Sequence, residues 1–91
     1  MNASWQVTHD PLRLIEAESD LSRFEAAARE HGEDLVQAEC IGAAKKKILD
    51  LGWYGGRYQV VLVEDDWSAP LKKIEAFDLR SAVTAFQQLA V

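Results

Sequence analysis

The sequence has only one cysteine, Cys40, so no disulfide can form within the 91-residue chain. A small core without disulfides favours a reducing compartment. The first residues lack the basic and apolar regions of a secretory signal. No apolar run approaches the roughly 18 residues that a membrane-spanning helix needs. These absences predict a cytoplasmic chain with no membrane partner.

Residues that carry catalysis or bind metals are also scarce. His9 and His31, the two histidines, have no cysteine or histidine beside them at the spacing of a zinc site. The acidic run Glu64–Asp66 lacks the second set of ligands that a hard cation requires, and aspartate is common in turns. We therefore expect no catalytic residues, no metal, no cofactor and no enzymatic activity.

The formal charge of −5 is unevenly spread along the chain. Residues 1–40 carry a net charge of −6 and residues 61–91 carry −2, whereas residues 41–60 carry +3. An acidic total repels phosphate backbones at long range, so it disfavours nonspecific nucleic-acid binding. The central stretch is the local exception to this pattern.

Hydrophobic residues make up 48% of the chain, enough to build one core, and the length fits a single domain spanning residues 1–91. The segment Pro11–Ala17 (PLRLIEA) resembles Pro70–Ala76 (PLKKIEA). Each copy follows a polar turn and precedes an alanine-rich run of helical pattern. We interpret them as parts of a pseudo-repeat, residues 4–31 and 57–90, in which each unit is strand–strand–helix.

Three helices are predicted from apolar spacing. One begins at Ser19 or Asp20 and ends before Gly32, which can adopt the left-handed conformation of a helix end. A long central helix is expected over residues 33–51, because its apolar side chains fall within an arc of about 140° at 100° per residue. Cys40 lies on that arc and is expected to be buried. The last helix is capped by Asp78 and buries five apolar side chains: Leu79, Ala82, Val83, Phe86 and Leu89.

The clearest strand is Arg57–Glu64, which is rich in β-branched and aromatic residues. Tyr58, Val60 and Leu62 are expected on one face. Its partner is Leu71–Phe77, and Ser4–Thr8 and Leu12–Ala17 are two further strands. The assembled prediction is an α+β fold in ββα–α–ββα order, with about four antiparallel strands and helices on one face. Its other face would be open and would carry apolar groups such as Val61, Val63 and Phe77 among Lys73 and Glu75.

The most distinctive stretch is Gly52–Tyr58 (GWYGGRY), which follows a run of three lysines. Trp53, Tyr54 and Arg57 on a glycine-containing loop are suited to stacking on bases or gripping a ligand. The structural interpretation is that Gly52 ends a helix and the two aromatic rings close the end of the core. Both interpretations remain open at the level of sequence.

Two functions follow from these features, and a third, a small enzyme, would require a pocket in which Cys40 or a histidine meets an acidic residue. The leading hypothesis is a noncatalytic binding or regulatory module that contacts a protein partner or forms a homodimer. Its candidate contact residues are Trp53, Tyr54, Arg57, Trp67 and Lys73, and Trp67 stands in an acidic turn where an exposed aromatic side chain would be a typical interface anchor. The alternative is a nucleic-acid-binding module that uses Lys45, Lys47, Trp53, Tyr54, Arg57, Lys72 and Lys73.

Overall fold

The computed structural model describes residues 5–17, 21–40, 46–64 and 69–90, which form an α+β fold built on a five-stranded sheet. The strands are β1 (Trp5–His9), β2 (Val36–Cys40), β3 (Lys47–Trp53), β4 (Tyr58–Val63) and β5 (Lys72–Ala76). The helical elements are the 3-10 turn η1 (Leu21–Phe24), α1 (Glu25–His31) and α2 (Leu79–Leu89). Every neighbouring pair of strands is antiparallel, and the strands stand in the sheet in chain order.

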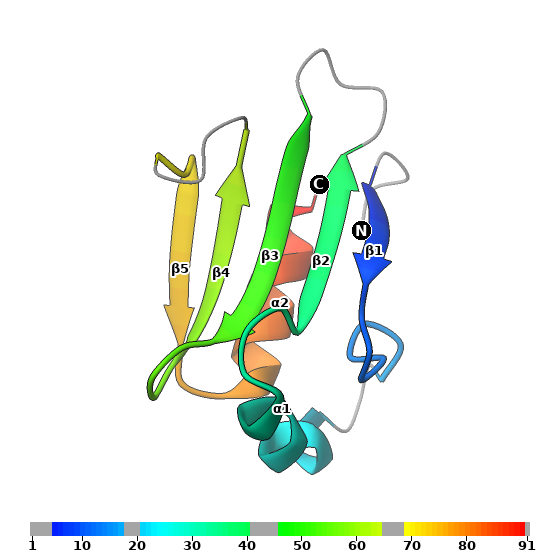
Figure 1. Ribbon diagram of the computed structural model, residues 1–91, viewed down its shortest axis with the longest axis vertical. Helices are drawn as coiled ribbons and strands as arrows, with labels where there is room; N and C mark the ends of the chain where they lie inside the picture. The colour runs from blue at the N-terminus through cyan, green and yellow to red at the C-terminus, as the bar shows by residue number, and fades with distance from the viewer. Residues whose placement is uncertain (1–4, 18–20, 41–45, 65–68, 91) are drawn as a thin grey trace.

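Helix α2 packs against one face of the sheet, over β3, β4 and β5 (Figure 1). Its apolar residues recur at three- and four-residue spacing, so they share one side of the helix. Leu79, Ala82 and Phe86 are fully buried there. Asp78 caps the helix as predicted, because its carboxylate accepts a hydrogen bond from the Ser81 N–H at 2.8 Å.

Strand alternation supplies the other half of the core. Tyr58 and Val60 are fully buried and Leu62 packs partly buried against them, so the predicted core face of this strand is confirmed. Leu49 and Leu51 of β3 point the same way and are also fully buried. Within the described part of the chain, no helix lies over the opposite face of the sheet (Figure 1).

The predicted central helix over residues 33–51 is wrong. Its described part forms β2 and β3, which pair with each other from Val36–Leu51 to Cys40–Lys47. The apolar residues of this segment also fit a two-residue period, and as paired strands they bury Val36, Ala38, Leu49 and Leu51 completely on one face of the sheet. Cys40 is therefore a half-buried strand residue packed against the core rather than part of a helix.

Two further details of the predicted order differ from the structure. Residues 11–17 form turns instead of a strand, because the Asp10 carboxylate accepts hydrogen bonds from the Leu14 and Ile15 N–H groups and holds the chain in a tight turn. One predicted strand is absent, and β2 and β3 replace the predicted central helix, so the sheet has five strands instead of four and the order is not ββα–α–ββα.

The first predicted helix is present as η1 and α1, and Gly32 ends it with a φ of 81°. The proposed caps Ser19 and Asp20 lie outside the described residues. The pseudo-repeat of residues 4–31 and 57–90 stays a prediction, although its two matching segments differ in conformation. No helix in the described ranges is long and apolar enough to cross a membrane.

Candidate functional site

The turn between β3 and β4 is a tight hairpin that exposes its two glycines. The Tyr54 N–H donates a hydrogen bond to the Arg57 carbonyl oxygen at 2.8 Å. Gly55 and Gly56 both have positive φ, 59° and 105°, which side-chain-bearing residues rarely adopt. Glycine is therefore required here by the turn itself, and the turn brings Trp53 and Arg57 to the same end of the sheet.

Trp53 is half-buried and packs against the core. Its ring meets Tyr58 edge-on, with ring centroids 4.7 Å apart and an interplanar angle of 63°. The Arg29 guanidinium lies over the Trp53 ring, 4.8 Å from its centroid. Trp53 therefore packs against the core as the structural interpretation expected, but Gly52 lies within β3 and ends no helix.

Tyr54 lies across the uncovered face of the sheet, above Gly52. A methyl group at Gly52 would come within 2.7 Å of the Tyr54 ring, so the glycine makes room for the ring. The Tyr54 hydroxyl reaches the Asp50 carboxylate at 3.5 Å, and the Gln37 amide donates to the same carboxylate at 3.4 Å. Tyr54 therefore covers a carboxylate in the middle of the sheet.

Asp50 is only 3% exposed although its side chain lies on the face opposite α2. Burial raises the pKa of Asp50 from its usual 3.8 to about 7, and the neighbouring Asp34 carboxyl acts in the same direction. Burial and the negative charge of Asp50 also raise the pKa of Tyr54 to about 12. The sequence pattern did not single out Asp50. The Lys46 ammonium pairs with Glu39 at 3.1 Å.

Arg57 links the hairpin to the last strand of the sheet. Its guanidinium donates to the Glu75 carboxylate of β5 at 2.7 Å, and both side chains are partly exposed. Lys73 stands two residues before Glu75 and opposite Val61 of β4. Two of the predicted contact residues, Arg57 and Lys73, therefore lie on or beside β5.

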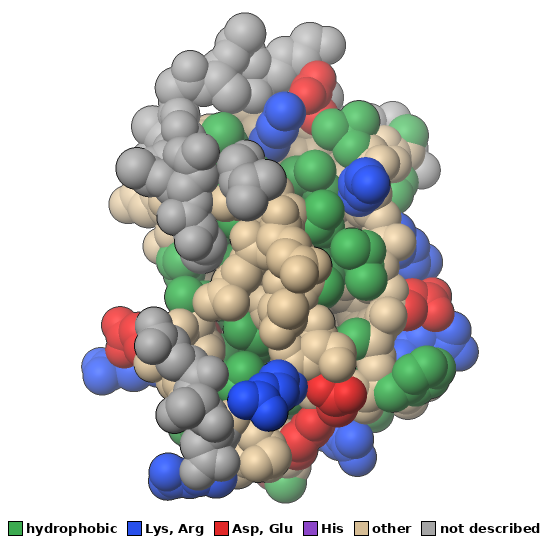
Figure 2. Space-filling view, turned by 180° about the vertical axis from the view of Figure 1, so that it is seen from behind, with side chains coloured by type: hydrophobic (Ala, Val, Ile, Leu, Met, Phe, Trp, Pro, Cys, Tyr) green, Lys and Arg blue, Asp and Glu red, His purple; other side chains and the backbone are tan. Residues whose placement is uncertain are grey.

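Two large apolar side chains flank this strand. Leu71 is 55% exposed just before β5, and Phe77 is 77% exposed just after it. Among the described residues, no other large hydrophobic side chain is exposed to this degree. We name the segment Leu71–Phe77, with the outer backbone edge of β5, the β5 edge. Figure 2, which views the molecule from the α2 side, shows hydrophobic side chains beside the polar outer surface of that helix, bordered by charged groups.

The four predicted contact residues that the structure describes lie in two places. Trp53, Tyr54 and Arg57 share the hairpin, Lys73 lies on β5, and Trp67 lies outside the described residues. The prediction missed Leu71, whose exposure depends on β5 being the last strand of the sheet. A signal was present in the sequence: the apolar residues Leu71 and Phe77 bracket a charged strand symmetrically.

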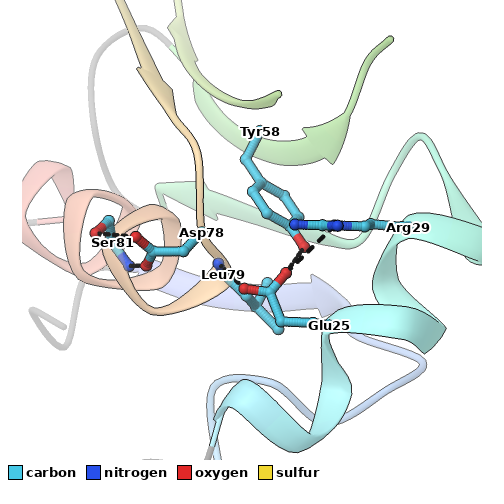
Figure 3. Close-up of polar contacts among 6 residues, drawn as sticks. All are labelled: Glu25, Arg29, Tyr58, Asp78, Leu79 and Ser81. Atoms are coloured by element: carbon cyan, nitrogen blue, oxygen red, sulfur yellow. Dashed lines mark hydrogen bonds and ion pairs between the residues drawn. The ribbon is translucent and has the colours of Figure 1, made fainter. Parts of the chain in front are cut away.

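A second polar cluster joins α1 to the beginning of α2 (Figure 3). One oxygen of the Glu25 carboxylate accepts the Leu79 N–H at 2.7 Å, and the other accepts the Tyr58 hydroxyl in a short hydrogen bond. Arg29 lies 3.6 Å from the same carboxylate. Burial, followed by the hydrogen bond to Glu25, raises the pKa of Tyr58 to about 12. Through these contacts Glu25 connects α1 to α2 and to β4, which is a structural role.

The described residues hold no group of three or more histidine, cysteine, aspartate or glutamate side chains arranged to bind a metal. A surface pocket of about 240 Å³ lies beside the start of α2, between Glu25, Asp78 and Arg80. Its two carboxylates already accept hydrogen bonds from backbone N–H groups of α2. Comparison of the chain with protein families, curated proteins and solved structures gives no match. The β5 edge is therefore the candidate site that the geometry supports best.

Proposed function

We propose that this chain is a noncatalytic module that works by binding another protein chain along the β5 edge. The observation that carries the proposal is the pair of exposed apolar side chains, Leu71 at 55% and Phe77 at 77%, at the two ends of an outer strand. Large exposed apolar groups are typical anchors of protein interfaces. An outer strand also offers backbone N–H and C=O groups to an added strand.

The other outer strand is less suited to this role. The pairing of β1 with β2 shifts between Val7 and His9, and such an irregularity twists an edge and interrupts pairing. By contrast, β5 pairs with β4 in one unbroken register from Tyr58–Ala76 to Leu62–Lys72. A regular strand presents a straighter edge to an incoming strand.

The nucleic-acid alternative receives less support. Lys46, Lys47 and Arg57 each lie within ion-pairing distance of a carboxylate: Glu39, Glu64 and Glu75, at 3.1, 3.9 and 2.7 Å. Their positive charge is therefore partly compensated within the chain, so less of it is available to phosphate groups. Trp53 is half-buried beneath Arg29, which leaves less of its ring for stacking.

Site-specific photo-crosslinking in an extract of the expressing cells tests the proposal. A photoreactive residue replaces Phe77, and a control chain carries it at Thr84, an exposed position on α2. We expect the Phe77 position to give a discrete protein product that excess unlabelled chain removes by competition. A competitor with Leu71→Ser and Phe77→Ser should not remove it. Equal products from both positions, or none at Phe77, would contradict the proposal.

Titration with short single-stranded RNA and DNA at two salt concentrations separates the alternative function. Tryptophan fluorescence reports the binding, and affinity for a nucleic acid should fall steeply as salt rises. Under the proposed function, the fluorescence stays unchanged even at low salt. A saturable, salt-sensitive change together with no crosslinked protein would favour nucleic-acid binding instead.

A further inference from the structure

The residues of the β5 edge are arranged symmetrically about Ile74, the central residue of the strand. Lys73 and Glu75 flank it at one position on either side, and Leu71 and Phe77 flank it at three positions. One side of Ile74 thus carries a positive charge and an apolar group, and the other side carries a negative charge and an apolar group. Such an arrangement complements a copy of itself running in the opposite direction.

Two-fold symmetry limits the ways in which two copies of β5 can pair. In an antiparallel pair of identical strands, one residue must face its own counterpart on the symmetry axis. Centring the pair on Lys73 or Glu75 would place like charges directly opposite each other, which is destabilising. Centring it on Ile74 places Lys73 opposite Glu75 of the second copy and Leu71 opposite its Phe77.

We propose that β5 pairs with β5 of a second copy of this chain, antiparallel and centred on Ile74, so that the two sheets become one. This proposal rests on the proposed function, since it names the partner of the β5 edge. Lysine on an outer strand usually discourages strand pairing. Here each Lys73 meets a carboxylate when the partner is a second copy, so the charge pattern selects that partner.

The two-fold axis is perpendicular to the sheet, so both α2 helices lie on the same face of the joined sheet. Each helix contacts β3, β4 and β5, so it is centred over β4, the middle strand of the three. The two β4 strands are three strand spacings apart, or about 14 Å. Packed helices need only about 8–10 Å between their axes, so the two helices fit without collision. Ile74, half-buried on that face, becomes covered by its counterpart.

The Glu75 carboxylate already has one cationic neighbour, Arg57, at 2.7 Å, and its side chain remains 41% exposed. It can therefore keep Arg57 and also accept Lys73 of the second copy, because an ionised carboxylate accepts several hydrogen bonds. The charges across the seam then alternate in sign along the strand. Reversing one of the two signs should disrupt this alternation in both halves of the dimer.

Charge reversal gives a direct test by sedimentation equilibrium of the whole chain in roughly 0.15 M salt. Lys73→Glu alone or Glu75→Lys alone places like charges opposite each other twice per dimer, so each variant should self-associate about tenfold more weakly than the wild type. An equimolar mixture of the two variants restores opposite charges at both places. We therefore expect the mixture to associate at least as tightly as the wild type.

Lys72→Glu is the matched control, because it makes the same charge change one residue away. Lys72 would face Ala76 of the second copy, so this variant should keep the wild-type association. Circular dichroism and a cooperative thermal transition show that each variant is folded. The double variant Lys73→Glu, Glu75→Lys has the charges exchanged and should dimerise like the wild type.

A wild-type chain that stays monomeric at the highest accessible concentration overturns the dimer. A dimer that Lys72→Glu weakens as much as Lys73→Glu, or that the mixed variants do not restore, overturns the pairing centred on Ile74. If the chain is monomeric but Phe77 still crosslinks to a different protein, this inference fails while the proposed function stands. If neither association is found, both fail.

Discussion

The Glu25 carboxylate accepts the backbone N–H of Leu79, which lies 54 positions further along the chain, at 2.7 Å. The first N–H groups of a helix have no partner within the helix, and a carboxylate there also interacts favourably with the helix dipole. The other Glu25 oxygen accepts the hydroxyl of Tyr58 in β4. One side chain thus joins α1, α2 and the sheet.

Replacement of Glu25 should destabilise the whole fold. Glu25→Gln removes the charge from two hydrogen bonds, so we expect it to lower the free energy of unfolding by about 1–3 kcal/mol. Urea denaturation measures the loss. Glu30→Gln is the matched control, since Glu30 is exposed on the same helix and should change stability by less than about 0.5 kcal/mol. Equal effects of the two substitutions would contradict this role of Glu25.

The N-cap of α2 gives a second stability prediction. Asp78→Ala removes the acceptor for the Ser81 N–H and should cost about 1 kcal/mol. Asp78→Ser keeps a capping oxygen and should recover most of that loss. Thermal unfolding of the three proteins compares them, and equal midpoints for the alanine and serine variants would show that the cap contributes little.

Asp50 should make stability depend on pH. Its pKa is about 7 in the folded chain and near 3.8 when unfolded, so between these values the folded chain holds a proton that the unfolded chain has lost. The contribution of Asp50 to the free energy of unfolding is therefore fully present below about pH 4. It is lost as the pH rises towards 7, and the loss is roughly 4 kcal/mol at most. Urea denaturation of the wild type from pH 4 to 8 should show this decline.

Asp50→Asn should remove that decline, because the amide does not titrate. Asp34→Asn should reduce the decline without abolishing it, since Asp34 is a smaller cause of the raised pKa than burial is. Asparagine suits the positive φ of 56° at this position, so the variant should fold. A wild-type pH profile that matches that of Asp50→Asn would exclude a raised pKa at Asp50.

The close approach of Gly52 and Tyr54 predicts non-additive mutations. Gly52→Ala places a methyl group where the Tyr54 ring lies and should cost about 1–2 kcal/mol, as in other overpacked sites. In a Tyr54→Ala background the same substitution should cost clearly less, since the ring is absent. Urea denaturation of the four proteins completes the cycle, and strictly additive losses would mean that the two residues do not interact.

Local pattern alone predicted the last third of the chain well. Alternation in β4, the partner strand β5 and the apolar spacing of α2 each involve neighbouring residues, and Asp78 lies next to the helix that it caps. In these segments local preference and tertiary packing favour the same structure. The outcome agrees with the prediction for that reason.

The middle of the chain could not be assigned in the same way. Val36, Cys40, Ile48 and Leu51 fit a helical arc, yet Val36, Ala38 and Cys40 also alternate as a strand requires. The choice depends on pairing with β1 and β4, which are distant in sequence. The candidate site was predicted only in part for a related reason: the exposure of Leu71 follows from the position of β5 at the border of the sheet.

Backbone amide hydrogen exchange tests the central claim, protein contact along the β5 edge, most directly. Exchange is measured with and without the partner, which is either the protein that the crosslink identifies or the chain itself at high concentration. We expect slower exchange at residues 71–77 in the complex and unchanged exchange in β1, the other outer strand. Protection confined to β1 or to the β3–β4 hairpin, with residues 71–77 unchanged, would contradict that claim.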